Sequence, residues 1–170
     1  KYLAAKTEFW RAGRKCAGVL HFCGLGYSRA GDKPRPEGGA TSDHFIDLET
    51  LALEPDFERY VRDAFSPVGL TLDYWGEDLY AGQRRELKVV VINDLYSDWK
   101  GEVNLRLMKD GNPVAAQGRS CTVAALGRET LSFKQTIPSQ PGEYILTAEL
   151  AAAGQRPVRS VRDARVVATR

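Results

Sequence analysis

The stretch Arg14-Lys15-Cys16-Ala17-Gly18-Val19-Leu20-His21-Phe22 runs from two cations through five small or aliphatic residues to a histidine and an aromatic residue. An apolar run this short is typical of a strand buried on both faces, as in parallel sheets covered by helices. Residues 2–13 mix aromatic and charged residues at helical spacing and predict a helix that ends near Gly13. Because a lone parallel strand needs partners on both edges, we expect this stretch to belong to a larger α/β protein.

The composition is that of a globular protein with room for one or two domains: 170 residues, 43% of them hydrophobic, with a net charge of +2. This charge is too small to predict a nucleic-acid or membrane partner, and no apolar run approaches the roughly 20 residues that cross a bilayer. The positive excess lies in residues 156–170, where five arginines face only Asp163. A charged edge strand is favoured there over an anion-binding strip.

The three cysteines predict free structural thiols, since they cannot all pair with one another and none has the spacing of a metal ligand. The sequence contains no P-loop and no zinc signature. Gly24-Leu25-Gly26 is not a dinucleotide fingerprint, because it lacks the third glycine and the helix that should follow. We therefore predict no cofactor and no metal site.

The pattern changes near Pro67, where we place a domain boundary between residues 1–67 and 68–170. A long glycine-rich loop over residues 23–41 precedes a short extended piece at residues 42–48. Pro55 predicts the first turn of a helix that Pro67 ends. From Val68 onward, short alternating runs with turns between them predict a β-sandwich or barrel. The predicted strands are residues 68–75, 86–95, 103–107, 114–116, 120–124, 129–136, 143–150 and 158–168.

Two local signals refine the second part. Lys109-Asp110-Gly111-Asn112 predicts a hairpin turn, in which the glycine and the asparagine can adopt a positive φ. Tyr144 follows the turn at Pro141-Gly142 near the start of a strand, which is the layout of the tyrosine corner of immunoglobulin-like domains. The alternative is a partly buried tyrosine of an ordinary strand.

Taken in order, several stretches resemble the C-terminal portion of family 2 glycoside hydrolases, the group of β-galactosidases, β-mannosidases and β-glucuronidases. These stretches are residues 9–11, 14–20, 43–47 and 60–68, and the strand ending in Asn93-Asp94-Leu95. The resemblance implies an α+β fragment, in which residues 1–67 form the last strand and helix of a (β/α)8 barrel. Residues 68–170 would form an immunoglobulin-like sandwich that supports the barrel.

The same resemblance implies an activity that this chain cannot perform alone. Family members cleave β-linked sugars with two glutamates about 5 to 5.5 Å apart, and both would lie upstream of Lys1. We therefore expect no hydrolysis of glycosides by these 170 residues alone. The implied partners are the carbohydrate substrate and the rest of the barrel, and polysaccharide breakdown would favour a secreted or periplasmic parent.

Candidate substrate-binding residues lie where a barrel strand would open onto its active face. Alignment on Gly18-Val19-Leu20 places Phe22 where the family usually has a sugar-lining tryptophan, with Cys23-Gly24 in place of a polar pair. A role in the core is the alternative for Phe22 and His21, and a role as satisfied loop residues is the alternative for the others. The candidates are His21, Phe22, Tyr27, Asp43 and His44.

A second function class stays open, in which the chain is a non-catalytic β-sandwich module that binds carbohydrate or a partner protein. Trp75 and Trp99 invite this interpretation because aromatic rings pack on the apolar C–H faces of sugars. Their alternative role is to cover a domain seam or fill the core. The sequence upstream of Lys1 would separate the two classes, since two glutamates at strand ends support the enzyme.

Overall fold

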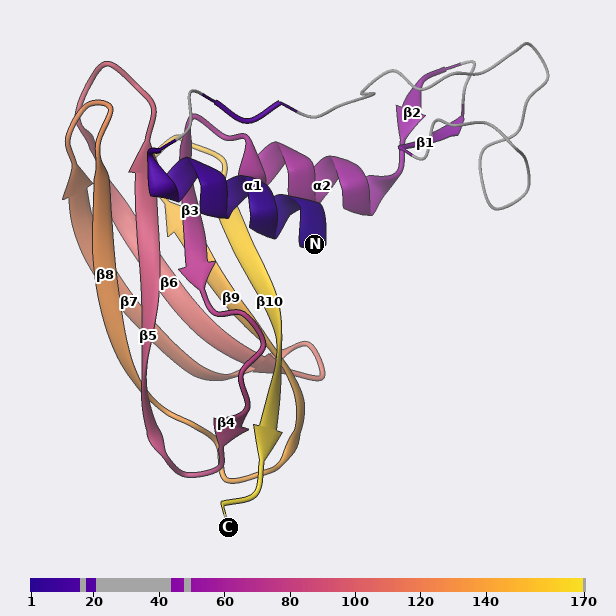
Figure 1. Ribbon diagram of the computed structural model, residues 1–170, viewed down its shortest axis with the longest axis vertical. Helices are drawn as coiled ribbons and strands as arrows, with labels where there is room; N and C mark the ends of the chain where they lie inside the picture. The colour runs from indigo at the N-terminus through magenta and orange to yellow at the C-terminus, as the bar shows by residue number, and fades with distance from the viewer. Residues whose placement is uncertain (16–17, 21–43, 48–49, 170) are drawn as a thin grey trace.

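The computed structural model describes residues 1–15, 18–20, 44–47 and 50–169, and these form a two-layer β-sandwich with a pair of helices across one end (Figure 1). One sheet has five strands in the order β4-β10-β9-β6-β7, and the other has three in the order β3-β5-β8. A separate pair, β1 (Phe45–Asp47) and β2 (Ala52–Leu53), precedes them.

The strands of the sandwich follow the alternation in the sequence. Side chains of one face of each strand meet between the sheets, where they form one core that includes the fully buried Phe133, Leu146 and Val89. The strands are β3 (Val68–Asp73), β4 (Leu79–Tyr80), β5 (Arg84–Asn93), β6 (Trp99–Lys109), β7 (Asn112–Val123), β8 (Arg128–Thr136), β9 (Gly142–Ala151) and β10 (Val158–Val167).

Both local turn signals are found, one with a changed detail. Lys109 pairs with Asn112, so the loop has two residues, and the positive φ angles are those of Asp110 (49°) and Gly111 (79°) rather than of Asn112. The hydroxyl of the buried Tyr144 donates to the carbonyl oxygen of Gln140 at 2.7 Å. This hydrogen bond confirms the tyrosine corner.

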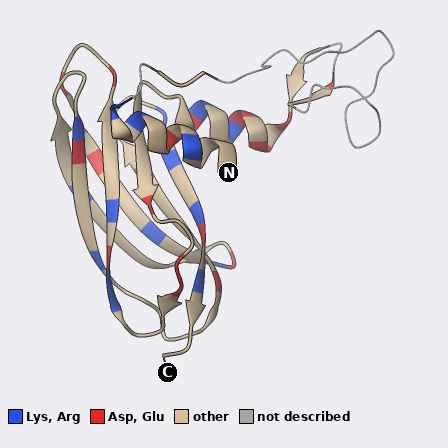
Figure 2. Cartoon of the chain, viewed as in Figure 1, with Lys and Arg blue, Asp and Glu red and all other residues tan. Residues whose placement is uncertain are grey.

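The two helices form where the sequence predicts them. α1 (Tyr2–Gly13) ends with Arg14 in the left-handed region, at φ 52°. α2 (Pro55–Ala64) begins with a proline in its first turn, and the side chain of Glu54 caps the N–H of Phe57. Positive and negative residues are interspersed over both helices and the strands (Figure 2).

A buried ion pair fixes α1 to the sandwich. The Glu8 carboxylate accepts from the Ser160 hydroxyl at 2.7 Å and from Arg162 Nη2 at 2.8 Å. Ser160 Oγ also accepts from the N–H of Leu72 at 3.0 Å, so this contact links α1 to both β3 and β10. Burial raises the pKa of Glu8 above its usual value, and the Arg162 guanidinium offsets this in part.

A second attachment joins the helices to the end of β5. Arg11 Nη2 donates to Asp94 Oδ2 at 2.7 Å and to the carbonyl oxygen of Ser66 at 2.6 Å. The guanidinium lies so close to Gly69 that a Cβ there would be 2.9 Å from Arg11 Nη1. Arg14 also donates to Asp94. Burial would raise the pKa of Asp94, but the two arginines outweigh it and lower that pKa.

The prediction of a barrel end followed by a sandwich is wrong. In the described residues every strand pairing is antiparallel except the two-residue contact of β10 with β4, and no parallel sheet covered by helices is present. Within the proposed buried strand, residues 18–20 are not a strand and Leu20 is 96% exposed. The physical reason is that burial on both faces requires flanking strands and covering helices, whereas α1 and α2 pack on the sandwich instead.

Residues 66–170 alone are expected to unfold cooperatively, because the core between the two sheets contains no residue that precedes Val68. Deleting residues 1–65 should lower the melting temperature, since Arg162 loses its partner, but should preserve a single thermal transition by circular dichroism. The intact chain is the control. Loss of the transition would mean that the helices and the sandwich share one folding unit.

Candidate binding groove

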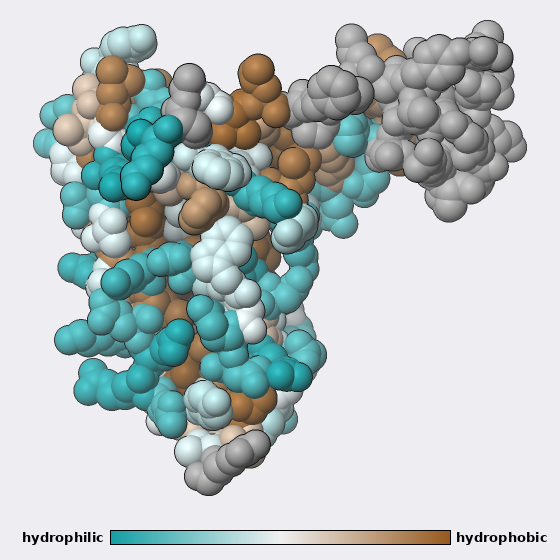
Figure 3. Space-filling model, viewed as in Figure 1, coloured by the Kyte–Doolittle hydropathy of each residue, from teal (hydrophilic) through white to brown (hydrophobic). Residues whose placement is uncertain are grey.

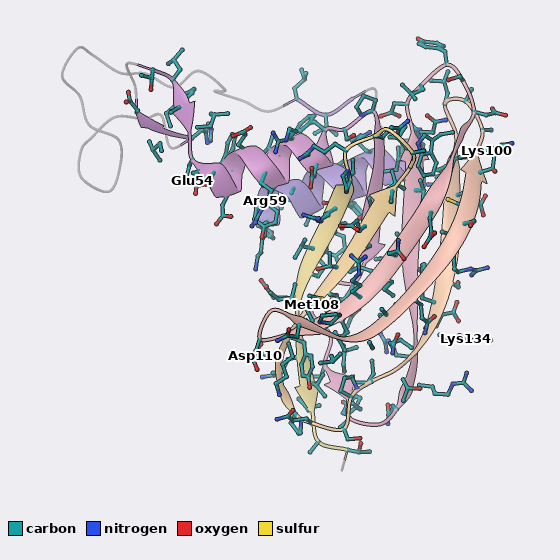
Figure 4. The ribbon with its side chains drawn as sticks, turned by 180° about the vertical axis from the view of Figure 1, so that it is seen from behind. Glu54, Arg59, Lys100, Met108, Asp110 and Lys134 are labelled. Atoms are coloured by element: carbon teal, nitrogen blue, oxygen red, sulfur yellow. The ribbon has the colours of Figure 1, made fainter. Side chains whose placement is uncertain are left out.

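A groove lies between α2 and the outer face of the five-stranded sheet. Its volume is about 730 Å³, within the range of small-molecule sites. Arg59 and Tyr60 of α2 form one wall, and the β6–β7 turn at Asp110 closes the opposite end. Seen from behind, Arg59 lies at the helical end of the sheet, with Met108 and Asp110 near the turn (Figure 4).

Strand register brings the floor of the groove together. Val161 of β10 is opposite Thr147 of β9, which is opposite Arg106 of β6, so these three side chains form one row across the outer face. The next row contains Met108 and Ile145, with Asp163 opposite Ile145. Their sequence neighbours point inward to the core, because successive side chains of a strand alternate between faces.

The floor is partly apolar. Ile145 is 39% exposed on a strand whose inward residues are buried, and Met108 and Val161 lie on either side of it. Tyr60 adds an aromatic ring at the wall, with the Arg59 guanidinium carbon 4.7 Å from its centroid. This combination offers contact area to an apolar face of a ligand.

Polar groups along the groove are held in fixed positions by ion pairs. Glu149 accepts from Arg159 Nε at 2.7 Å and from Arg106 Nη1 at 3.1 Å. Burial alone would raise the pKa of Glu149, but the bonds from these two arginines lower it below its usual value. Asp63 of α2 is buried, pairs with Arg156 and accepts from the backbone N–H of Arg159 at 3.2 Å. Glu149 and Asp63 are thus each paired with arginine, although Arg156 itself lies outside the lining.

β10 pairs with β4 only at Val166 and Val167, and the side chains of Arg156, Arg159 and Arg165 are about half exposed, as expected for a charged edge strand, whereas Arg162 is buried. Arg156 pairs with Asp63, Arg159 with Glu149, Arg162 with Glu8 and Arg165 with Asp78. Arg170 lies outside the described residues. Sequence analysis missed these pairs because each partner is distant in the sequence, except for Glu149.

Four of the five predicted substrate-binding residues, His21, Phe22, Tyr27 and Asp43, lie outside the described residues. His44 is described, and its ring stacks on Phe57 with centroids 4.1 Å apart. Its carbonyl oxygen accepts from the N–H of Glu54 at 2.7 Å. The roles assigned to these five residues stay predictions.

The two tryptophans differ in their surroundings. Trp99 is 3% exposed in the core, and its Nε1 donates to Gln155 Oε1 at 3.1 Å, which fits the core alternative. Trp75, by contrast, is 47% exposed after β3.

Hydrophobic residues gather near the helices in the space-filling view, whereas the lower flank is mostly hydrophilic (Figure 3).

The remaining chemistry of the described part of the chain is limited. Cys121 is a free, partly buried thiol, and burial raises its pKa. Where side chains are described, no group of three or more His, Cys, Asp or Glu residues is arranged to hold a metal. Neither described helix is long and apolar enough to cross a membrane.

Comparison with known proteins shows only distant likenesses. No family model matches the sequence, and no curated protein matches it. Solved structures with some likeness include a β-glucosidase from Listeria innocua, at 15% identity and a TM-score of 0.48 over 60% of this chain and 16% of that one. The CARDB domain of a Pyrococcus furiosus protein has 18% identity and a TM-score of 0.47 over 61% of this chain and 91% of its own. The DNA glycosylase AlkC of Pseudomonas fluorescens has 13% identity and a TM-score of 0.45 over 59% and 30%.

Proposed function

We propose that this chain is a non-catalytic β-sandwich module that binds neutral, β-linked carbohydrate in the groove under α2. The observation that carries the proposal is the lining itself, in which an apolar floor at Met108, Ile145 and Val161 adjoins fixed polar groups. Sugars present apolar C–H faces and many hydroxyls, so they match a surface that offers both. Polar groups already held in place cost less entropy to order on binding.

The charge arrangement favours a neutral ligand over an anion. Arg106 and Arg159 both bond to Glu149, and Arg59 pairs with Asp56 at 2.7 Å. An anionic ligand would have to compete with these carboxylates for the arginines. A hydroxyl can accept from a guanidinium or donate to a carboxylate without breaking the pair. The groove therefore suits a polyhydroxylated ligand without charge.

Replacing Tyr60 by alanine is expected to weaken binding of a β-linked glucose hexamer about tenfold, because the ring supplies the aromatic wall of the groove. Isothermal titration calorimetry with the β-1,4- and β-1,3-linked hexamers measures this. Tyr80→Ala is the matched control, since Tyr80 is 45% exposed on β4 and does not line the groove. Failure of the unsubstituted chain to bind either hexamer would contradict the proposal.

The second candidate function is that of a supporting domain in an enzyme: the sandwich supports the catalytic part of a glycoside hydrolase that acts on β-linked sugars. It is favoured by the exposed aromatic residues of α1, where Phe9 and Tyr2 are 50% and 72% exposed on a helix fixed to the sandwich. Surfaces of this kind mark interaction sites. Glutamates at strand ends in sequence upstream of Lys1 would favour this candidate, and turnover of aryl β-glycosides by the 170-residue chain would contradict both candidates.

A further inference from the structure

A second pocket of about 290 Å³ lies on the other side of β10 from the groove. Its aromatic lining consists of Tyr2 of α1, Trp75 after β3 and the buried Tyr74, and Gly76 continues the turn beside Trp75 with φ 99°. Val161 and Asp163 line both this pocket and the groove. The two cavities are therefore neighbours that share one stretch of β10.

The Trp75 ring is held in place before any ligand arrives. Its Nε1 donates to Asp73 Oδ1 at 3.1 Å, and the Arg162 guanidinium carbon lies 5.4 Å from its ring centroid. Phe9 of α1 packs against it at 5.5 Å with an interplanar angle of 88°. Although three groups fix it, the residue remains nearly half exposed. An exposed aromatic ring with little freedom to lose is a favourable surface for stacking.

Asp163 stands at the boundary between the two cavities. Its carboxylate accepts from Lys1 Nζ at 2.6 Å, yet its side chain remains 66% exposed. The carboxylate thus has capacity to accept further hydrogen bonds from hydroxyls. The shared residues would then contact a ligand that passes from one cavity to the other.

We propose that the groove and the Tyr2–Trp75 pocket are two subsites of one extended site, which binds a linear chain of β-linked neutral sugars across Val161 and Asp163. This inference rests on the proposed function and assigns its substrate class: an oligosaccharide longer than a disaccharide. The groove contributes its polar network and apolar floor, and the pocket contributes aromatic stacking. A disaccharide fills one subsite only, whereas a hexamer reaches both.

The test is calorimetric titration of the intact chain with β-linked glucose dimer and hexamer. The hexamer is expected to bind at least tenfold more tightly than the dimer. Trp75→Ala should remove that advantage and leave the dimer affinity within about twofold, while Tyr60→Ala should weaken both ligands. Tyr2→Ala, at a more exposed position, should reduce hexamer affinity without affecting the fold and serves as the second variant if Trp75→Ala proves unstable.

The outcomes separate the two proposals. If hexamer affinity is unchanged in Trp75→Ala and Tyr2→Ala but falls in Tyr60→Ala, the extended site is wrong and the groove stands. Equal affinities of dimer and hexamer also overturn the extended site. If Tyr60→Ala leaves both affinities unchanged, or if no sugar binds at all, the groove is not the site and both proposals fail.

Discussion

Replacing Glu8 by alanine is expected to lower the free energy of unfolding by about 3–5 kcal/mol, because it breaks a buried ion pair from one side. The Glu8 side chain is 3% exposed and that of Arg162 is 8% exposed. Without Glu8 the only hydrogen bonds left to the guanidinium are a 3.3 Å contact to Thr71 Oγ1 and a bond to the carbonyl oxygen of Val161, and its Nε already has no hydrogen-bond partner. At this chain length the loss corresponds to a fall in melting temperature of about 6–20 °C.

Two controls make this result specific. Glu58→Ala breaks an exposed pair with Arg62 on α2 and should cost about 0.5 kcal/mol or less. The double variant Glu8→Leu with Arg162→Met removes both charges together and should recover most of the loss, since apolar residues often replace a buried pair without net cost. Denaturant unfolding measures all three variants. A loss for Glu8→Ala no larger than that for Glu58→Ala would contradict a buried pair.

Phe133→Ala is expected to destabilise the sandwich by about 3–5 kcal/mol, the range for truncating a buried phenylalanine. Phe133 is fully buried on β8, opposite Leu87 of β5, and its ring faces the core between the two sheets. Removing the ring leaves a cavity, and the strands cannot move in to fill it because backbone hydrogen bonds hold them in their sheets. The midpoint of chemical denaturation should fall accordingly.

The control for this cavity is Val114→Ala on β7, a strand at the sheet edge. Val114 is 48% exposed, and substitutions at such surface positions usually change stability by about 0.5 kcal/mol or less. If Phe133→Ala were as mild as Val114→Ala, the packing of the two sheets against each other would be wrong.

Local sequence patterns predicted most of the helices and strands, but not in every case whether a segment is buried. The helix with Pro55 in its first turn, the hairpin at Asp110-Gly111 and the strands after Val68 follow from signals within a few residues of one another. The strand proposed over residues 14–22 failed in its described part. A short apolar run does not by itself predict burial, because burial depends on which segments from elsewhere in the chain pack against it.

The groove illustrates the same division. Alternation places Arg106, Met108 and Ile145 on the solvent face of their strands, and this much can be inferred from the sequence. Their alignment with Val161 depends on the register of three strands, and their wall depends on how α2 packs against β10. No local signal encodes either relation, so sequence analysis sought the sugar site in residues 21–44 instead.

The sequence by itself determined most of the strand and turn pattern after Val68 and the presence of the two helices, because these depend on interactions over a few residues. It predicted β7 as two strands, missed β4 and left the tyrosine corner open against an ordinary strand tyrosine. Only the tertiary structure decided that α1 attaches to the sandwich through Glu8 and Arg162, which are 154 residues apart. It also decided that the groove and the Trp75 pocket share one stretch of β10. Contacts over such separations depend on the packing of the whole chain, which no periodicity in the sequence records.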